Sequence, residues 1–305
     1  MDILILAEKK KIAEPFVNAI ISKGHNAKYI RISKLILVSK QNETLIKIKD
    51  HELQQYDAIF LQVRSNLAPF VEPLLDELEE TGYYTTAKRG SYYLAMNEPY
   101  QFVNLTLNQV PTPKTITTGS AKNIEKISKK ISYPLISKSF IGRNVQQALI
   151  VKNNKELNAF IKSIKTEVDG FMLRQFIEDH VISCAVIGKK VFAIKRKYAD
   201  SSLEEINNGK TYRLNETEEK TAIKATLASN LDIARVDLCK GKVVKVDPKV
   251  DWVAFDTISS ESIEDFVADF LIEKAKQHEH KIKLKYDIFG IRKIFKNSIF
   301  GKVLK

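Results

Sequence analysis

The segment Val110–Thr115, with the sequence VPTPKT, divides the chain into two parts that differ in their order of strands and helices. A proline fixes its own backbone and disfavours helix at the residue before it, so this segment is expected to be extended. Before it, apolar strand patterns alternate with helical patterns, which is typical of a small, mostly parallel α/β domain. After it, strands and helices come in clusters, which predicts an α+β arrangement.

The individual elements follow from hydrophobic periodicity and from turn residues. In the first part we expect strands at Asp2–Ala7, Ala27–Ile32 and Asp57–Val63, a hairpin of Leu35–Ser39 with Thr44–Ile48, and a helix at Pro69–Glu80. In the second part we expect strands at Pro134–Lys138, Gln146–Val151, Gly170–Ile177, Val181–Ile187, Lys190–Lys197, Ile233–Leu238 and Lys242–Val246, with helices at Ile124–Ile131, Lys155–Ile164, Glu216–Leu227 and Ile263–Ala275.

Composition limits the class of protein. A chain of 305 residues exceeds a typical single-core domain, and it has no apolar run of the roughly 18 residues that cross a bilayer. Its only cysteines, Cys184 and Cys239, lie far apart, which fits a reducing cytoplasm and no zinc site. Both are expected to be buried in strands. The net charge is +12, and Glu273–Lys305 supplies +7 of it, from ten basic and three acidic residues.

Four segments in a fixed order carry the functional information. They are QVPTPKT (109–115), YPLISKSFIGRNVQQALIV (133–151), GFMLRQFIEDHVISCAVIGKKVFAIKRK (170–197) and LDIARVDLCKGKVVKVDPK (231–249). In this order the chain resembles the RimK-like glutamate ligases of the ATP-grasp superfamily. Those enzymes have a V-P-x-P-x-T linker, a lysine strand before a glycine-rich lid, a hinge strand that contacts adenine, and a G-V-D…E-x-N metal hairpin.

The resemblance implies a domain organisation. It implies an N-terminal pre-ATP-grasp α/β domain at 1–90, a helical connector and linker at 91–115, and a two-subdomain ATP-grasp module. The two subdomains are expected at 116–178 and 179–278, and a basic amphipathic tail at 279–305.

The resemblance also implies a nucleotide site. Lys138 matches the phosphate-binding lysine, for which the plain alternative is a solvated lysine at a strand end. Gly142 and Arg143 fall in the lid, whose backbone amides and basic groups would contact phosphate. Gln175–Ile177 (Gln175, Phe176 and Ile177) match the hinge, whose backbone groups would contact adenine.

The metal hairpin is implied at two aspartates. Asp237 matches the aspartate of the family motif, and Asp247 stands where the family has asparagine, so both are candidate Mg²⁺ ligands. The bridging glutamate aligns with Lys245, whose ammonium cannot bind a metal but could take its place between the aspartates. The turn leaves the register open, because a two-residue loop pairs Asp237 with Val244 and a three-residue loop pairs it with Lys245.

Other positions also depart from the family pattern. The lid, Ser139–Asn144, holds one glycine where three are usual. An aspartate–lysine pair is replaced by Asn97-Glu98, so a carboxylate stands where triphosphate needs a cation. The Asp-x-Arg that begins the strand after the hinge reads Val181-Ile182-Ser183.

Three functions therefore remain open, of which the third is a peripheral membrane protein held by the basic tail. The first is an ATP- and Mg²⁺-dependent carboxylate–amine ligase, which adds an amino acid to a protein, peptide or cofactor. The second is a non-catalytic ATP-grasp pseudoenzyme that acts as a binding or assembly module.

The C-terminal tail is a separate candidate interaction surface. In Tyr286–Lys305, apolar residues recur at helical spacing between lysines and arginines, which predicts a basic amphipathic helix. It could pack on the body of the protein, or it could bind an acidic protein or an anionic membrane surface. Its isoleucine and phenylalanine face fits nucleic acid poorly, since nucleic-acid sites rely on phosphate contacts and stacking aromatics.

Overall fold

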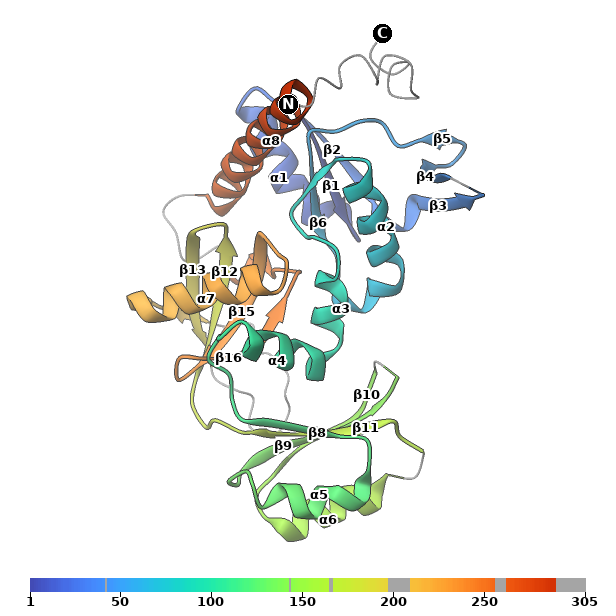
Figure 1. The fold of residues 1–305 in the computed structure, drawn as a ribbon. Coiled ribbons are helices and arrows are strands. Elements are labelled where there is room, and N and C mark those ends of the chain that lie inside the picture. The colour runs from blue at the N-terminus through green and yellow to red at the C-terminus, as the bar shows by residue number, and fades with distance from the viewer. Residues whose placement is uncertain (42, 143, 165–166, 197–208, 256–261, 289–305) are drawn as a thin grey trace. The chain divides into compact units, whose positions relative to one another are not determined.

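The computed structural model describes residues 1–41, 43–142, 144–164, 167–196, 209–255 and 262–288 (Figure 1). These residues form two compact units. The first unit contains Met1–Gln62, Asp76–Thr86 and the helix that follows Ile263. The second unit contains Val63–Leu75 and Ala87–Ile263.

A four-stranded parallel sheet with the order β2–β1–β6–β7 forms the centre of the first unit. Its two middle strands are apolar at nearly every position and buried, as expected when a parallel sheet is covered on both faces. Helix α1 packs against it, with the rings of Phe16 and Phe60 edge to face at 5.4 Å. The elements are β1 (Asp2–Ala7), α1 (Lys10–Ser22), β2 (Asn26–Arg31), β6 (Ala58–Gln62) and β7 (Tyr84–Thr85). The predicted parallel α/β domain is confirmed.

The first unit has two further parts. The predicted hairpin forms as β3 (Leu35–Lys40) and β4 (Glu43–Ile48), and β5 (His51–Glu52) extends it to three strands. The C-terminal helix α8 (Ile263–Ile288) continues well past Ala275, where the sequence suggested its end. The rest of the predicted amphipathic tail, 289–305, lies outside the described residues.

The second unit begins with an antiparallel sheet in the order β10–β9–β11–β8. One face of this sheet packs on two helices, α5 and α6, around a core that includes Leu135, Leu157 and Leu173 (Figure 1). The elements are β8 (Thr115–Thr118), α5 (Ala121–Ser128), β9 (Leu135–Ile141), β10 (Asn144–Val151), α6 (Asn154–Ser163) and β11 (Gly170–Gln175). Since side chains alternate along a strand, Lys138, Met172 and Arg174 project from the opposite face.

A second antiparallel sheet, with the order β14–β13–β12–β15–β16, completes the unit. Helix α7 packs along it and begins with a capping box, in which Asn215 and Glu218 each accept from the other's backbone N–H. The elements are β12 (Val181–Ile187), β13 (Lys190–Arg196), β14 (Lys210–Thr211), α7 (Glu216–Ala228), β15 (Ile233–Cys239) and β16 (Lys242–Asp247). The predicted α+β arrangement after the linker is confirmed.

The proline-containing linker and the helix before it, α4 (Glu98–Leu107), run beside the edge strand β16. Val243 donates its backbone N–H to the carbonyl of Pro111 at 2.8 Å. The side-chain amide of Gln101 acts like a strand residue, since it donates to the carbonyl of Val246 at 2.8 Å and accepts from its N–H at 3.0 Å. The edge of the sheet is thereby paired, and α4 is fixed to the hairpin.

Both cysteines are buried in strands, as predicted: Cys184 lies in β12 and Cys239 in β15. Neither forms a disulfide. Burial raises the pKa of the Cys239 thiol to about 11, so this thiol stays protonated at neutral pH. Among the described helices, none combines the length and the apolar character that a membrane crossing requires.

The carboxylate of Glu72, on α2 (Ala68–Glu80), binds the beginning of α3 (Ser91–Met96). It is 2% exposed and accepts from the backbone N–H groups of Gly90 at 2.7 Å, Tyr92 at 2.6 Å and Tyr93 at 3.0 Å. These donors are the first amides of α3, which have no partner within the helix.

We expect Glu72→Ala to lower the free energy of unfolding of the second unit by about 3 kcal/mol, because it leaves buried amides unsatisfied. The chain's single tryptophan, Trp252, lies in the same unit, so its fluorescence during urea unfolding reports on this change. The control is Glu79→Ala, at an exposed position of the same helix. Equal unfolding midpoints for the two variants would contradict the assigned role of Glu72.

Candidate nucleotide and metal site

Helix α4 presents a carboxylate at its first turn. Asn97 caps the helix, with its side-chain oxygen accepting from the N–H of Tyr100 at 3.1 Å, and Pro99 follows at the second helical position. Glu98 is therefore the first residue of the helix, and Gln101 holds the same turn against β16. The position of Glu98 is thus set by a cap on one side and by a strand on the other.

Glu98 joins two cations on the neighbouring sheet. One carboxylate oxygen forms a close ion pair with the Nζ of Lys138 on β9, and the other accepts from Nη1 of Arg174 on β11 at 2.8 Å. The same Nη1 donates to the carbonyl of Val244 on β16 at 3.0 Å. We call Glu98, Lys138 and Arg174 the ion triad. It connects α4, the first sheet and the hairpin of the second sheet.

The three groups of the ion triad are mostly buried, and Arg174 is the most enclosed, with 6% of its side chain exposed. Burial opposes ionisation of Glu98, but the charges of Arg174 and then Lys138 outweigh it and lower the pKa of the carboxyl group. Burial lowers the pKa of Lys138, against the opposing effect of Glu98. At neutral pH the carboxylate of Glu98 is therefore ionised and compensates the cations around it.

An apolar cluster lies beside the ion triad on the same face of the sheet. It contains Phe102 of α4, Phe140 of β9 and Met172 of β11. The guanidinium of Arg174 lies 5.0 Å from the centre of the Phe102 ring, a cation–π contact. Glu98 and Phe102 are one helical turn apart, so one side of α4 supplies both the anion and the ring.

The hairpin of β15 and β16 resolves the register that the sequence left open. Its turn is two residues long, with Lys240 at φ 47° and Gly241 at φ 71°, as a type I′ turn requires. The predicted consequence of such a turn, a pairing of Asp237 with Val244, is wrong. A bulge shifts the register after the first pairs, and Asp237 lies opposite Lys245.

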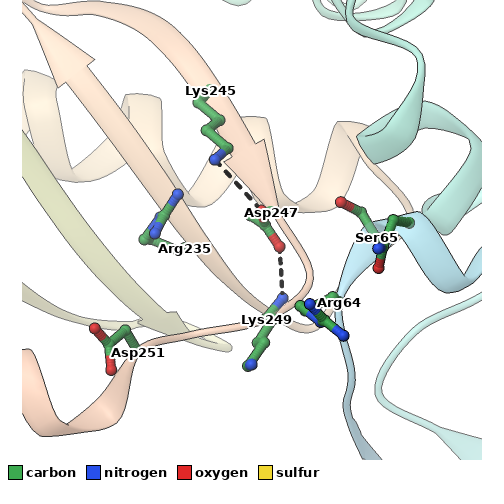
Figure 2. A pocket seen from close by; sticks show the side chains of 8 residues that line it. Arg64, Ser65, Arg235, Lys245, Asp247, Lys249 and Asp251 are labelled. Atoms are coloured by element: carbon green, nitrogen blue, oxygen red, sulfur yellow. Dashed lines mark hydrogen bonds and ion pairs between the residues drawn. The ribbon is translucent and has the colours of Figure 1, made fainter. Parts of the chain in front are cut away.

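The two predicted metal ligands each have partners from the protein itself. Asp237 accepts from Oγ of Ser183 at 2.6 Å, and its other oxygen lies 3.4 Å from Nε of Arg235. Asp247 pairs with Nζ of Lys245 at 3.6 Å and accepts from the N–H of Lys249 at 3.0 Å (Figure 2). Over the part of the chain that the structure describes, no three His, Cys, Asp or Glu side chains are grouped as a metal site.

The predicted lid is shorter than its sequence suggested. Ser139–Ile141 belongs to β9 and Asn144 begins β10, so only Gly142 and Arg143 connect the strands. Gly142 has φ 57°, and its N–H is bound by the carboxylate of Asp169. Arg143 lies outside the described residues. The assignment of this turn to phosphate binding stays a prediction.

Backbone groups of the predicted hinge are engaged by the chain itself. The N–H of Gln175 donates to the backbone carbonyl of Lys114 at 2.9 Å, and the N–H of Phe176 donates to the carbonyl of Pro134 at 3.2 Å. The carbonyl of Ile177 accepts from the Cys239 thiol at 3.5 Å. An adenine at the hinge would have to bind the polar groups of Gln175–Ile177 that these contacts leave. The adenine site therefore stays a prediction.

The structure adds three residues that the sequence analysis did not single out: Arg64, Arg174 and Arg235. Arg174 and Arg235 lie in buried, mostly apolar strands, and a basic residue within such a strand was the signal that could have found them. Arg64 follows the short strand β6 and carries no recognisable motif.

Comparison with solved structures defines the class of this fold. The RiPP-associated ATP-grasp ligase of Chryseobacterium gregarium, solved with ADP and a leader and core peptide, superimposes with a TM-score of 0.67 at 14% identity, covering 90% of this chain and 97% of that one. The RimK domain protein of Sphaerobacter thermophilus gives a TM-score of 0.66 at 16% identity, and the match covers 89% of this chain and 99% of that one. The protein therefore has the ATP-grasp fold.

Sequence comparison gives the family within this class. The family model of the RimK-like ATP-grasp domain matches residues 97–249, half of the chain. A probable alpha-L-glutamate ligase from Vibrio parahaemolyticus is 21% identical over 274 residues, which cover 86% of this chain and 91% of the relative. The chain belongs to the RimK-like ATP-grasp family, which confirms the resemblance seen in the sequence.

The ion triad predicts a pH-dependent contribution to stability. We expect Glu98→Gln to lower the free energy of unfolding at pH 7 by about 3 kcal/mol, because two mostly buried cations lose their anion. The folded pKa of Glu98 is below its unfolded value of about 4.3, so its contribution is complete above that pH and is lost as the pH falls through the folded pKa. The gap between wild type and variant should therefore stay constant near neutrality and shrink below about pH 4.

Urea unfolding followed by Trp252 fluorescence at several pH values measures this gap. The matched control is Glu216→Gln, which breaks the exposed pair of Glu216 with Lys220, where the side chains are 80% and 72% exposed. Such a surface pair contributes at most about 1 kcal/mol. A Glu98→Gln effect as small as that of the control, or independent of pH, would rule out the stabilising role of the triad.

Proposed function

We propose that this protein uses the ATP-grasp scaffold to bind a ligand and does not carry out the ATP-dependent ligation of its family. The observation that carries this proposal is the position of Glu98. Its carboxylate neutralises Lys138, the residue that matches the family's phosphate-binding lysine, and also Arg174 beside it. The protein thereby supplies an anion at the place where the resemblance implies the phosphates of the nucleotide.

Electrostatics explains why this arrangement opposes ATP. A triphosphate at Lys138 would have to displace Glu98 from two cations and then lie beside its carboxylate. Breaking a buried ion pair costs about 3–5 kcal/mol, which corresponds to a loss of affinity of roughly two to four orders of magnitude. Repulsion between the carboxylate and the phosphates adds to this cost.

The hairpin residues do not fit a Mg²⁺ site. Magnesium requires near-octahedral oxygen ligands at close range, usually carboxylates and water. Here Asp237 is bound by Ser183 and lies beside Arg235, while Asp247 is bound by Lys245 and Lys249. Lys245 also stands where the family motif has its bridging glutamate, so an ammonium replaces a ligand.

A peptide-like compound is the ligand class that we propose. Structural neighbours of this chain were solved with precursor peptides, among them a macrocyclase from Microcystis aeruginosa and the Chryseobacterium ligase. A protein that retains the scaffold but lacks the reaction would act as a binding or assembly module for such a chain. The predicted basic tail, as a second contact to a partner, stays a prediction.

A second candidate function is the ligation reaction itself. It is favoured by the length over which the chain matches probable alpha-L-glutamate ligases, 91% of the Vibrio parahaemolyticus relative, and by the retention of Lys138 on β9. In that case Mg·ATP would bind as in the family, and Glu98 would leave Lys138 when the nucleotide arrives. Nucleotide binding separates the two candidates.

We expect no saturable binding of Mg·ATP at millimolar concentration. A ligand at about ten times its Kd stabilises the folded state by about 1.4 kcal/mol, which a thermal shift detects. Isothermal titration calorimetry of the full chain is the independent measurement, and Lys138→Ala is the control for site specificity. Saturable binding by the wild type that Lys138→Ala abolishes would overturn the proposal in favour of the ligase.

We expect Lys245→Glu to create Mg²⁺ affinity, because it places a third carboxylate next to Asp237 and Asp247. Calorimetric titration with Mg²⁺ measures it. Adding Glu98→Lys should then restore stabilisation by Mg·ATP, since the phosphates gain a cation and lose a neighbouring carboxylate. If Lys245→Glu folds but binds no Mg²⁺, the hairpin does not have the geometry that we assign to it.

A further inference from the structure

Strand β3 forms the edge of the three-stranded sheet β3–β4–β5 in the first unit, and among the described strands it pairs with β4 alone. Its register with β4 runs over six residue pairs without a bulge. Its sequence, LILVSK, contains no proline and only one charge, at the last residue. Native proteins usually protect an edge of this length with prolines, bulges or charges, so the edge of β3 is expected to be covered by another strand.

Every second residue of β3 directs its backbone N–H and C=O away from β4. In an antiparallel pair, residues that exchange hydrogen bonds with the partner strand alternate with residues that face away from it. Ile46, opposite Leu37, uses its carbonyl on the side of β5, where it accepts from the N–H of Leu53 at 2.8 Å. Leu37 therefore faces away from β4, and so do Leu35 and Ser39. No described residue binds the backbone of Leu37 or Ser39 on this side.

The side chains of β3 are apolar on both faces of the sheet. Since side chains alternate along a strand, Leu35 and Leu37 lie on one face, and Ile36 and Val38 lie on the other. The side chain of Ile36 is 49% exposed, and those of Leu37 and Val38 are half-buried. A short run that is apolar on both faces is typical of a strand in the interior of a sheet.

We propose that β3 pairs antiparallel with β3 of a second copy of this chain, about a two-fold axis at Leu37. The two sheets then form one continuous six-stranded sheet. Leu37 lies opposite its own copy, and Leu35 lies opposite Ser39 of the other copy. On the other face, Ile36 lies opposite Val38. This register pairs all the residues that face away from β4, and it rests on no residue of the candidate nucleotide site.

Four backbone hydrogen bonds follow from this register. The two copies of Leu37 exchange two bonds, in which each N–H donates to the other copy's carbonyl. At each end, the N–H of Ser39 donates to the carbonyl of Leu35. The N–H of Leu35 is not needed, because it already donates to the carbonyl of Ile32 within its own chain. The apolar pairs of Ile36 with Val38 add to the stability of the joined sheet.

Charge favours a second copy over an acidic or basic partner. No charged residue lies between Lys34 and Lys40, so the edge does not select a charged strand. Lys34 meets Lys40 of the other copy only at the ends, where Glu43 lies opposite Lys40 and compensates it. Because each copy carries a net charge of +12, salt should strengthen their association, whereas it would weaken binding to an acidic partner.

Analytical ultracentrifugation of the full chain measures this association. We expect a dimer whose Kd falls as the salt concentration rises. Ile36→Lys should raise Kd at least roughly tenfold, because it places a charge in an apolar pair and adds repulsion between the copies. The matched control is Ile21→Lys on α1, where Ile21 is 52% exposed and lies outside β3, and Kd should stay within about twofold. Far-UV circular dichroism verifies that both variants are folded.

Cysteine cross-linking tests the register itself. Leu37→Cys places two cysteines directly opposite each other, with Cα atoms about 5.5 Å apart, a distance that a disulfide spans. In Ser39→Cys the two cysteines lie four residues apart along the strands, or about 14 Å, which is too far. Both natural cysteines are buried. Mild oxidation should therefore give a disulfide-linked dimer from Leu37→Cys and not from Ser39→Cys.

Several results would overturn the proposal. They are a dimer that Ile36→Lys leaves unchanged, equal cross-linking of the two cysteine variants, association into larger oligomers, and a wild type that stays monomeric. Hydrogen exchange at the N–H of Leu37 then identifies what replaces the second copy. Protection in a monomer means that another segment of this chain covers the edge, and protection that appears only with an added extended peptide assigns the edge to a different protein.

Discussion

The ion triad of Glu98, Lys138 and Arg174 is the interaction on which the second unit depends. Its carboxylate comes from α4, its cations come from the first sheet, and Arg174 also binds the carbonyl of Val244 in the hairpin. Three elements distant in sequence are thereby joined around one charge. Because each charge of the triad is mostly buried, loss of one would leave another uncompensated, which is more costly than loss of an exposed pair.

Two charge reversals in this unit complement each other. The resemblance to the family implies a phosphate anion held by lysines and a metal cation held by carboxylates. Here Glu98 supplies an anion next to Lys138, and Lys245 supplies a cation next to Asp247. Each reversal balances charges that an unoccupied ATP-grasp site would leave unbalanced. On the function proposed above, the two together would let the scaffold be stable without nucleotide or metal.

Local sequence patterns predicted the fold well because they act over short distances. The continuous apolar runs in β1 and β6, the turn residues Lys240 and Gly241, and the linker at Val110–Thr115 all follow from local sterics and burial. The contact of Glu98 with Arg174 joins positions 76 residues apart, and no periodicity encodes it. The bulge that brings Lys245 opposite Asp237 could not be predicted from the sequence either. The pairing of the two strands, and not a local pattern, decides which residue of β16 stays unpaired.

A shared fold and a shared reaction require different evidence, and the function that we propose for this chain separates them. The ATP-grasp fold is maintained by buried strands such as β9 and β15, which tolerate many sequences as long as their pattern of burial is kept. The reaction requires particular charges at particular points, where a single reversal changes the sign of the interaction with the triphosphate. The resemblance to the family implies two such reversals, at Glu98 and at Lys245, and Glu98 is mostly buried within ion pairs. Restoring one alone would leave the other opposing Mg·ATP, so the two positions have to be considered together.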